Sequence, residues 1–245
     1  MGGLLETEGV VKSFGALVAN DGISISVPEG EVRGIIGPNG SGKSTFFNCV
    51  TGFYSLDRGT IRFGGTDITG LSPDKIAHEG LVRTFQIVSP FEDLTVRQNL
   101  LAVHTRGFRI SKEKRARADE ILDFLEIEHI ADNEASEMSG GQQKLLELGR
   151  ALMLEPRCIM LDEPTAGVNP ALQTRILERL QTLNEQGTTF VVVEHDMKLI
   201  QEFADSITVF DQGSVIAEGS FDHVKNEPRV REAYLGVDAE EGGLE

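Results

Sequence analysis

One glycine-rich segment constrains the fold of this chain more than any other feature. Residues 37–45 fit the pattern G-x-x-x-x-G-K-[ST], and they follow an apolar run, Val32–Ile36, that is typical of a buried strand. Glycines at positions 40 and 42 let backbone amides turn inward around an anion, because no Cβ atom stands in the way. Lys43 supplies a charge to the β- and γ-phosphates, and the Ser44 hydroxyl is suited to one position on Mg²⁺. The residues expected to hold the nucleotide are Gly37, Pro38, Asn39, Gly40, Ser41, Gly42, Lys43, Ser44 and Thr45.

A second strand-like run ends in two carboxylates. Residues 158–161 are apolar and are followed by Asp162 and Glu163. In an open α/β sheet the ligand lies beyond the carboxyl ends of the strands, so Asp162 is placed to hold Mg²⁺ through water. Glu163 points elsewhere, because side chains alternate along a strand, and can orient or deprotonate an attacking water. Taken alone, the same residues could be an ordinary acidic turn before Pro164.

The order of apolar patterns predicts an α/β fold. Strand-like runs cover 4–11, 23–27, 32–36, 60–63, 82–86, 158–161, 189–193 and 207–210, and helical spacing covers 43–52, 171–186 and 197–203. Between 93 and 154 the pattern is helical throughout, with amphipathic stretches at 96–103, 112–125 and 142–154. We therefore expect a largely parallel sheet covered on both faces, with an inserted helical lobe.

Composition narrows the class of protein. The chain has 245 residues, and 39 acidic against 23 basic side chains give a net charge of −16. Such a surface repels a phosphate backbone, which argues against non-specific nucleic-acid binding. No apolar run approaches the ~20 residues of a membrane span, and the first residues lack the features of a signal peptide. The two cysteines, Cys49 and Cys158, lack metal-site spacing and favour a reducing compartment. The expectation is a soluble cytoplasmic protein.

A third motif carries a family resemblance. Residues 138–143 read Met-Ser-Gly-Gly-Gln-Gln and lie 19 residues before the run that ends in the acidic pair. Ser139 and Gln142 could simply be a capping box at the start of an apolar helix. In this order and at this distance, however, the motif resembles the signature of ATP-binding cassette (ABC) ATPases. The residues assigned to the signature are Ser139, Gly140, Gly141 and Gln142.

Further positions match the family in order over about residues 4–235. Phe14 matches the aromatic residue that stacks on adenine, where tyrosine is usual. Gln86 matches the glutamine loop, which contacts Mg²⁺ or water and joins the core to the helical lobe. His195 matches the switch histidine that contacts the γ-phosphate. Residues 166–169, Ala-Gly-Val-Asn, stand where many relatives have Ser-Ala-Leu-Asp, which puts details of the contact between two cassettes in doubt.

A narrower resemblance is to the LivG-type ATPases of branched-chain amino-acid importers. It is carried by Arg-Thr-Phe-Gln at 83–86 and by the segments 91–100, 147–153, 166–170, 216–219 and 233–236. ATPases of urea and other amide importers are close enough to be confused with this chain. Lipopolysaccharide-export ATPases end similarly but generally lack the Arg-Thr-Phe-Gln form.

The resemblance implies an ABC nucleotide-binding domain: a P-loop NTPase (RecA-like) core, an N-terminal antiparallel β region and an inserted α-helical subdomain. The implied division is 1–92 and 155–220 for the core, 93–154 for the signature subdomain and 221–245 for a C-terminal helical extension and acidic tail. The implied cofactors are ATP and Mg²⁺, with the metal held by Ser44, Gln86 and Asp162. Glu163, His195 and Gln86 are the implied catalytic residues.

The implied mechanism needs partners. Two cassettes pair head to tail, and the signature of one contacts the γ-phosphate bound by the other. The second subunit is either a paralogue or another copy of this chain. Transmembrane permease subunits hold the pair at the cytoplasmic face of the membrane, and a periplasmic or extracellular solute-binding protein acts indirectly. A soluble ABC regulatory or remodelling protein, or a binding module without turnover, is the competing interpretation.

Overall fold

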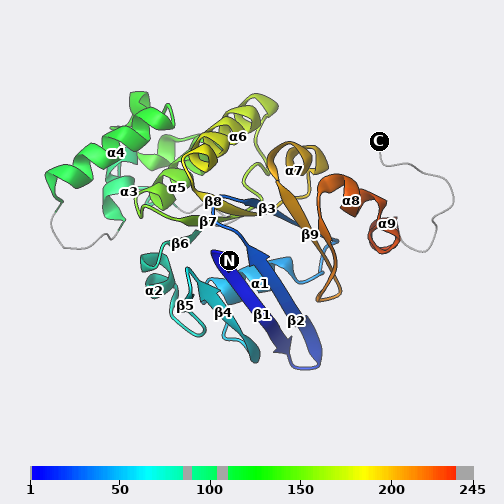
Figure 1. The fold of residues 1–245 in the computed structure, drawn as a ribbon. Coiled ribbons are helices and arrows are strands. Elements are labelled where there is room, and N and C mark those ends of the chain that lie inside the picture. The colour runs from blue at the N-terminus through cyan, green and yellow to red at the C-terminus, as the bar shows by residue number, and fades with distance from the viewer. Residues whose placement is uncertain (1, 85–89, 104–109, 236–245) are drawn as a thin grey trace.

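Two β-sheets and their covering helices form the molecule (Figure 1). The structure is a computed structural model, and it describes residues 2–84, 90–103 and 110–235. The larger sheet has six strands in the order β10-β9-β3-β8-β7-β6. Its strands are β3 (Val32–Ile36), β6 (Leu81–Arg83), β7 (Cys158–Asp162), β8 (Thr189–Val193), β9 (Ser206–Asp211) and β10 (Ser214–Gly219). All neighbours are parallel except the β10–β9 pair, so the expected parallel sheet is present with one antiparallel edge.

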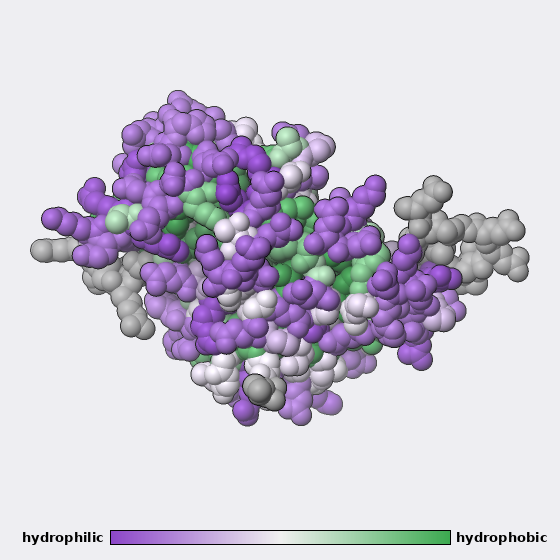
Figure 2. Space-filling model, turned by 45° about the horizontal axis from the view of Figure 1, so that its top comes forward, coloured by the Kyte–Doolittle hydropathy of each residue, from purple (hydrophilic) through white to green (hydrophobic). Residues whose placement is uncertain are grey.

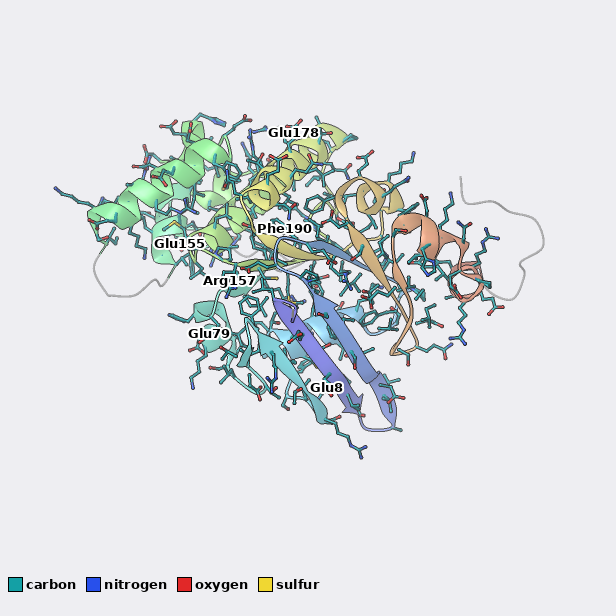
Figure 3. The ribbon with its side chains drawn as sticks, viewed as in Figure 1. Glu8, Glu79, Glu155, Arg157, Glu178 and Phe190 are labelled. Atoms are coloured by element: carbon teal, nitrogen blue, oxygen red, sulfur yellow. The ribbon has the colours of Figure 1, made fainter. Side chains whose placement is uncertain are left out.

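Side chains of the central strands point alternately to the two faces of this sheet, and both faces are buried. Residues 189–193 of β8 are all buried, as are residues 158–162 of β7. Phe190 and Val192 belong to the core on the side of the helical lobe, whereas Val191 and Val193 belong to the core on the other side. Phe190 accordingly lies at the centre of the molecule, while Glu8, Glu79 and Glu178 lie at its periphery (Figure 3). A strand buried on both faces needs an unbroken apolar run, which is what the sequence has here.

The second sheet is antiparallel and N-terminal. Its order is β2-β1-β4-β5, with β1 (Leu5–Phe14), β2 (Leu17–Val27), β4 (Arg58–Phe63) and β5 (Thr66–Asp67). Helix α1 (Lys43–Val50) lies between the two sheets and fills the space with Phe46, Phe47 and Val50, all fully buried. The expected N-terminal antiparallel region is therefore confirmed, and it encloses the helix that follows the glycine-rich segment.

Helices cover the opposite face of the six-stranded sheet. They are α6 (Pro170–Glu185), α7 (Met197–Phe203) and a lobe of three helices, α3 (Val96–Ala102), α4 (Lys112–Phe124) and α5 (Gly140–Leu152) (Figure 1). Short 3-10 turns at Glu128–Ile130 and Ala135–Glu137 join α4 to α5. These helices share one continuous core with the central strands. The predicted insertion of a helical lobe is confirmed.

Two short C-terminal helices complete the described chain. Helices α8 (Phe221–Asn226) and α9 (Pro228–Leu235) pack on the β9–β10 edge through Val224 and Val230. A further helix, α2 (Pro73–His78), precedes β6. The strand expected at 82–86 begins one residue earlier and ends at Arg83, while residues 85 and 86 lie outside the described part of the chain.

The surface is polar, as the charge predicts. Most of the face drawn in Figure 2 is hydrophilic, with hydrophobic residues visible mainly in the recesses between elements. Within residues 2–84, 90–103 and 110–235, no helix is both long and apolar enough to cross a bilayer.

Candidate functional site

Three neighbouring parallel strands deliver the predicted site residues to one edge of the sheet. The glycine-rich segment follows β3, the acidic pair stands at the end of β7, and His195 follows β8. Because β3, β8 and β7 are adjacent and parallel, their carboxyl ends meet at one edge. The structure thus brings together residues that are more than a hundred positions apart in the chain.

Glycine is required at two positions of the phosphate loop. Gly37 has a φ of 150°, and a Cβ there would lie 2.1 Å from the backbone oxygen of Phe210. Gly42 has a φ of 103°, and a Cβ there would lie 2.3 Å from the oxygen of Ala19. The Asn20 side chain also donates to the Gly42 carbonyl, at 3.1 Å. Backbone packing, as well as space for a ligand, therefore dictates these glycines.

Lys43 is held against the loop from which it projects. Its ammonium donates to the carbonyl oxygens of Gly37 at 2.7 Å and of Pro38 at 3.0 Å. Burial lowers the pKa of Lys43, while the nearby carboxylates of Glu163 and Asp162 oppose that shift. The charge thus sits within the loop, where phosphate oxygens can replace the two carbonyls as its acceptors.

The start of α1 is suited to binding an anion. Gly42 caps this helix without a side-chain hydrogen bond, so the first amides have no side-chain oxygen as an acceptor. Ser44 lies exposed in the first turn. Amides at a helix N-terminus bind phosphate through both direct hydrogen bonds and the helix dipole.

The residues available for Mg²⁺ are suited to that ion. The hydroxyl of Ser44 and the carboxylate of Asp162 are hard oxygen donors, and Mg²⁺ uses few protein ligands together with water and substrate phosphates. Asp162 is only 5% exposed. Among the described residues, no group of three or more His, Cys, Asp and Glu side chains could hold a metal ion. The third predicted ligand, Gln86, lies outside the described residues.

Glu163 and His195 are in direct contact. The Oε1 atom of Glu163 lies 3.0 Å from Nε2 of His195. Glu163 has a φ of 51°, a conformation that non-glycine residues seldom adopt, because the chain turns sharply where β7 ends. Its side chain therefore leaves the strand direction through this turn, rather than through the simple alternation that we expected. An uncommon backbone conformation of this kind is often found at functional sites.

Lys144 joins the signature helix to that turn. From α5 it donates to the carbonyl oxygens of Glu163, at 3.0 Å, and of Pro164, at 3.3 Å. Burial lowers the pKa of Lys144, and three nearby carboxylates oppose the shift. The signature helix and the acidic turn are thus mechanically connected within one chain.

The signature residues open α5. Ser139 is the N-cap and forms a reciprocal capping box with Gln142, as the sequence predicts. The space around Gly140 is open, whereas a Cβ on Gly141 would lie 1.9 Å from the side chain of Leu172. The helix start can therefore face an external anion.

Phe14 lies at the end of β1 with 44% of its surface exposed. Its ring contacts Tyr54 edge-on at 5.3 Å between centroids, and the ammonium of Lys12 lies 5.3 Å from its centre. An exposed aromatic ring of this kind offers a face for stacking.

Sequence reasoning missed several residues of this site. Arg83 pairs with Asp162, and Glu194 binds Thr165 and the amide of His195. Arg83 belongs to the Arg-Thr-Phe-Gln segment that carries the family resemblance, but the sequence assigns it no role. One available signal was a charged residue within an apolar strand, since a buried charge requires a partner.

A phosphate loop, an acidic strand end and a nearby glutamate–histidine pair on a parallel sheet together define a P-loop ATPase domain. The family model described as "ABC transporter" matches residues 20–166, and a model described as "Branched-chain amino acid ATP-binding cassette transporter" matches residues 214–240. The chain belongs to the ABC transporter family, as an ATP-binding ATPase cassette.

Named relatives span nearly the whole chain. A probable branched-chain amino acid transport ATP-binding protein LivG of Archaeoglobus fulgidus is 42% identical, over 96% of each chain. The high-affinity branched-chain amino acid transport ATP-binding protein BraF of Pseudomonas aeruginosa is 40% identical, over 95% of this chain and 98% of its own.

Solved structures agree with the fold. An ATP-binding cassette of an ABC transporter in its ADP conformation superposes with a TM-score of 0.87 at 41% identity, over 96% of this chain and 99% of that one. A dimeric post-hydrolysis cassette bound to ADP and Pi gives 0.78 at 29% identity, over 88% and 98%. The predicted ABC nucleotide-binding fold is thereby confirmed.

Proposed function

We propose that this chain is the ATP-hydrolysing subunit of a branched-chain amino-acid importer. One observation supports ATP hydrolysis: four side chains lie at the ends of adjoining strands, namely Lys43, Asp162, Glu163 and His195. The names of the LivG and BraF relatives support the choice of solute, as does the family match at residues 214–240. Urea, amides and lipopolysaccharide are the competing cargoes to be tested.

Each residue has a role that follows from its position. The loop amides and Lys43 bind the β- and γ-phosphates of ATP. The Glu163 carboxylate orients the attacking water and accepts its proton, and His195, 3.0 Å away, fixes the carboxylate and reaches the γ-phosphate. Ser44, Asp162 and Gln86 are the residues that would hold Mg²⁺. When bound, that ion neutralises phosphate charge.

The complete site needs a second cassette. The amides at the start of α5, with Ser139, Gly140, Gly141 and Gln142, face the γ-phosphate bound by the partner subunit. The solved dimeric cassette bound to ADP and Pi supports this arrangement. Hydrolysis removes the shared ligand, and the pair opens. Residues 93–154 form the subdomain that transmits the movement, through Gln86, to permease subunits at the cytoplasmic membrane face.

Two variants test the hydrolytic roles. Glu163→Gln keeps the shape of the side chain but removes the base, so ATP binding is retained and kcat falls at least ~100-fold. Lys43→Ala weakens ATP binding itself, because the loop loses its charge. Both are measured by equilibrium binding of a fluorescent ATP analogue and by phosphate release. Full turnover by Glu163→Gln would remove Glu163 from the mechanism.

The pairing is tested on the same variant. Size exclusion with light scattering on Glu163→Gln distinguishes self-pairing, which gives a dimer only with ATP, from a required paralogue, which leaves an ATP-bound monomer. Ser139→Ala in the Glu163→Gln background abolishes any ATP-dependent dimer if the signature acts across the interface. Dimerisation that is unchanged by Ser139→Ala would contradict that role.

The cargo is tested with the whole transporter. The chain is co-purified with its permease subunits, reconstituted in proteoliposomes, and supplied with the solute-binding protein. We expect leucine, isoleucine or valine to stimulate phosphate release, and urea or short amides to have no effect. Stimulation by urea alone would exclude the branched-chain assignment.

A further inference from the structure

Arg83 is a buried cation whose role none of the preceding steps explains. It ends β6, and its side chain is only 8% exposed. A guanidinium cannot lose its proton in a protein, so burial requires a permanent partner.

That partner is the carboxylate expected to serve Mg²⁺. Nη2 of Arg83 donates to Oδ2 of Asp162 at 2.6 Å, and Nη1 donates to Oδ1 of Asn48 at 2.5 Å. The guanidinium carbon also lies 5.5 Å from the centre of the Phe47 ring. Arg83 therefore connects the end of β7 to α1, the helix whose first turn carries Ser44.

The same carboxylate also lies in the field of a second cation. Asp162 and Glu163 act electrostatically on Lys43, so positive charge borders this region from both α1 and β6. When a divalent cation approaches Asp162, one of the two carboxylate oxygens is already bound by Arg83. The pair orients the carboxylate and opposes the arrival of more positive charge.

We propose that Arg83 is a positioning residue that serves as the built-in counter-ion of Asp162, aligning this carboxylate and keeping the site poor in Mg²⁺ until a nucleotide triphosphate arrives. The inference rests on the proposed metal site. According to this proposal, the metal binds tightly only when nucleotide phosphates are present, because they add negative charge to the site. Removal of the arginine charge then tightens metal binding in the nucleotide-free protein.

The magnitude follows from Coulomb's law. Even at the dielectric of bulk water, a charge of +1 and a charge of +2 about 6 Å apart interact strongly enough to change an affinity about tenfold, and the interaction is stronger at a buried site, so tenfold is the lower bound. Mn²⁺ binding, followed by electron paramagnetic resonance without nucleotide, measures this directly. We expect Arg83→Gln to bind Mn²⁺ at least about tenfold more tightly than the unmodified chain, and Arg83→Lys, which keeps the charge, to stay within about twofold.

Two control variants test whether the change in Mn²⁺ affinity arises at Asp162. Arg58→Gln removes the same charge from an exposed position of β4 and is expected to leave Mn²⁺ affinity unchanged. Adding Asp162→Asn to Arg83→Gln abolishes the gain. If Arg83→Gln alone is too unstable to purify, the double variant is expected to restore folding, since it removes the uncompensated carboxylate. Failure to restore it would overturn the proposal.

Titration of Mn²⁺ in the presence of ATP separates this inference from the function on which it rests. Absence of protein-bound Mn²⁺ in the presence of ATP, beyond the Mn²⁺ that ATP alone chelates in a protein-free control, would refute the metal site itself. Normal binding with ATP, combined with equal nucleotide-free affinities for the unmodified chain, Arg83→Gln and Arg58→Gln, would refute only the counter-ion role. A tenfold gain in Arg83→Lys would also refute it, because charge would then not be the cause.

Discussion

The buried carboxylate of Glu194 links the segment that carries Glu163 to the segment that carries His195, and Thr165→Val tests that link. Glu194 is 4% exposed. Its Oε1 accepts hydrogen bonds from the Thr165 hydroxyl at 2.7 Å and the Thr165 amide at 3.1 Å, and its Oε2 accepts one from the His195 amide at 3.2 Å. The turn that carries Glu163 is thus tied to the residue just before His195.

The structure sets the size of the effect. Valine matches threonine in shape, so Thr165→Val removes one short hydrogen bond without opening a large cavity. A hydrogen bond to a charged group contributes about 1.5–3 kcal/mol, so the free energy of unfolding should fall by about 2 kcal/mol. For a chain of this size each kcal/mol shifts Tm by about 2–4 °C, so Tm should fall by about 4–8 °C.

Circular dichroism during urea and thermal unfolding measures the loss. Thr174→Val is the matched control, because that hydroxyl donates to the Pro170 carbonyl at 3.1 Å from an exposed position. It should change stability by less than about 0.5 kcal/mol. Thr165→Ser keeps the hydroxyl and should retain most of the stability. If Thr165→Val is no more destabilising than Thr174→Val, the Glu194 network does not hold these segments together.

Three further predictions test other parts of the structure. Asn99 is fully buried and makes four hydrogen bonds, at 2.9–3.2 Å, to backbone groups at and before the start of α3, so Asn99→Leu should lower the unfolding free energy by about 3 kcal/mol in urea unfolding. A loss under about 1 kcal/mol would mean that the segment relaxes around leucine. Gly42→Ala should lower the nucleotide-free Tm more than Gly40→Ala, because both have positive φ but only a Cβ at 42 would meet the β2 backbone, at 2.3 Å. Equal shifts would show that strain, and not collision, dominates. Tyr234 keeps 39% of its surface exposed, but partial desolvation of its phenol raises the pKa to about 12, while a hydrogen bond from the Gly37 backbone opposes the shift. A raised phenol pKa in the folded state stabilises fully below the unfolded pKa of 10.0, and this contribution is lost as pH rises through about 12. Ultraviolet titration of Tyr54→Phe reports Tyr234 alone, since the chain has two tyrosines and no tryptophan. A midpoint near 10 would contradict the raised pKa of the phenol.

Elements with strong local signals were predictable from sequence. The expected strand 189–193 and helix 197–203 coincide with β8 and α7. The strand is an unbroken run of buried β-branched and aromatic residues, and Asp196 caps the helix by accepting hydrogen bonds from two amides. Helix α2 and strand β5 were not predicted, because six and two residues are too short for a periodic pattern.

The candidate site likewise has a part that the sequence predicts and a part that it does not. The phosphate loop is a local feature, since its glycines, lysine and flanking elements are contiguous. The order of motifs then indicated Asp162, Glu163 and His195. Contacts such as Arg83 to Asp162, 79 residues apart, depend on which strands become neighbours, and sequence periodicity does not determine that order.

The distribution of charge shows why an acidic chain can hold a polyanion. The net charge of −16 repels phosphate at long range, but salt screens that repulsion over about 10 Å. Within the site, positive charge is concentrated and held in place: Lys43 on loop carbonyls, Lys144 on the carbonyls after β7, and Arg83 on Asp162. Of these, Lys43 has acceptors that phosphate oxygens can directly replace. Phosphate binding can therefore replace the hydrogen-bond acceptors of Lys43, while Lys144 and Arg83 keep theirs. The structural change on binding is then confined to the phosphate loop.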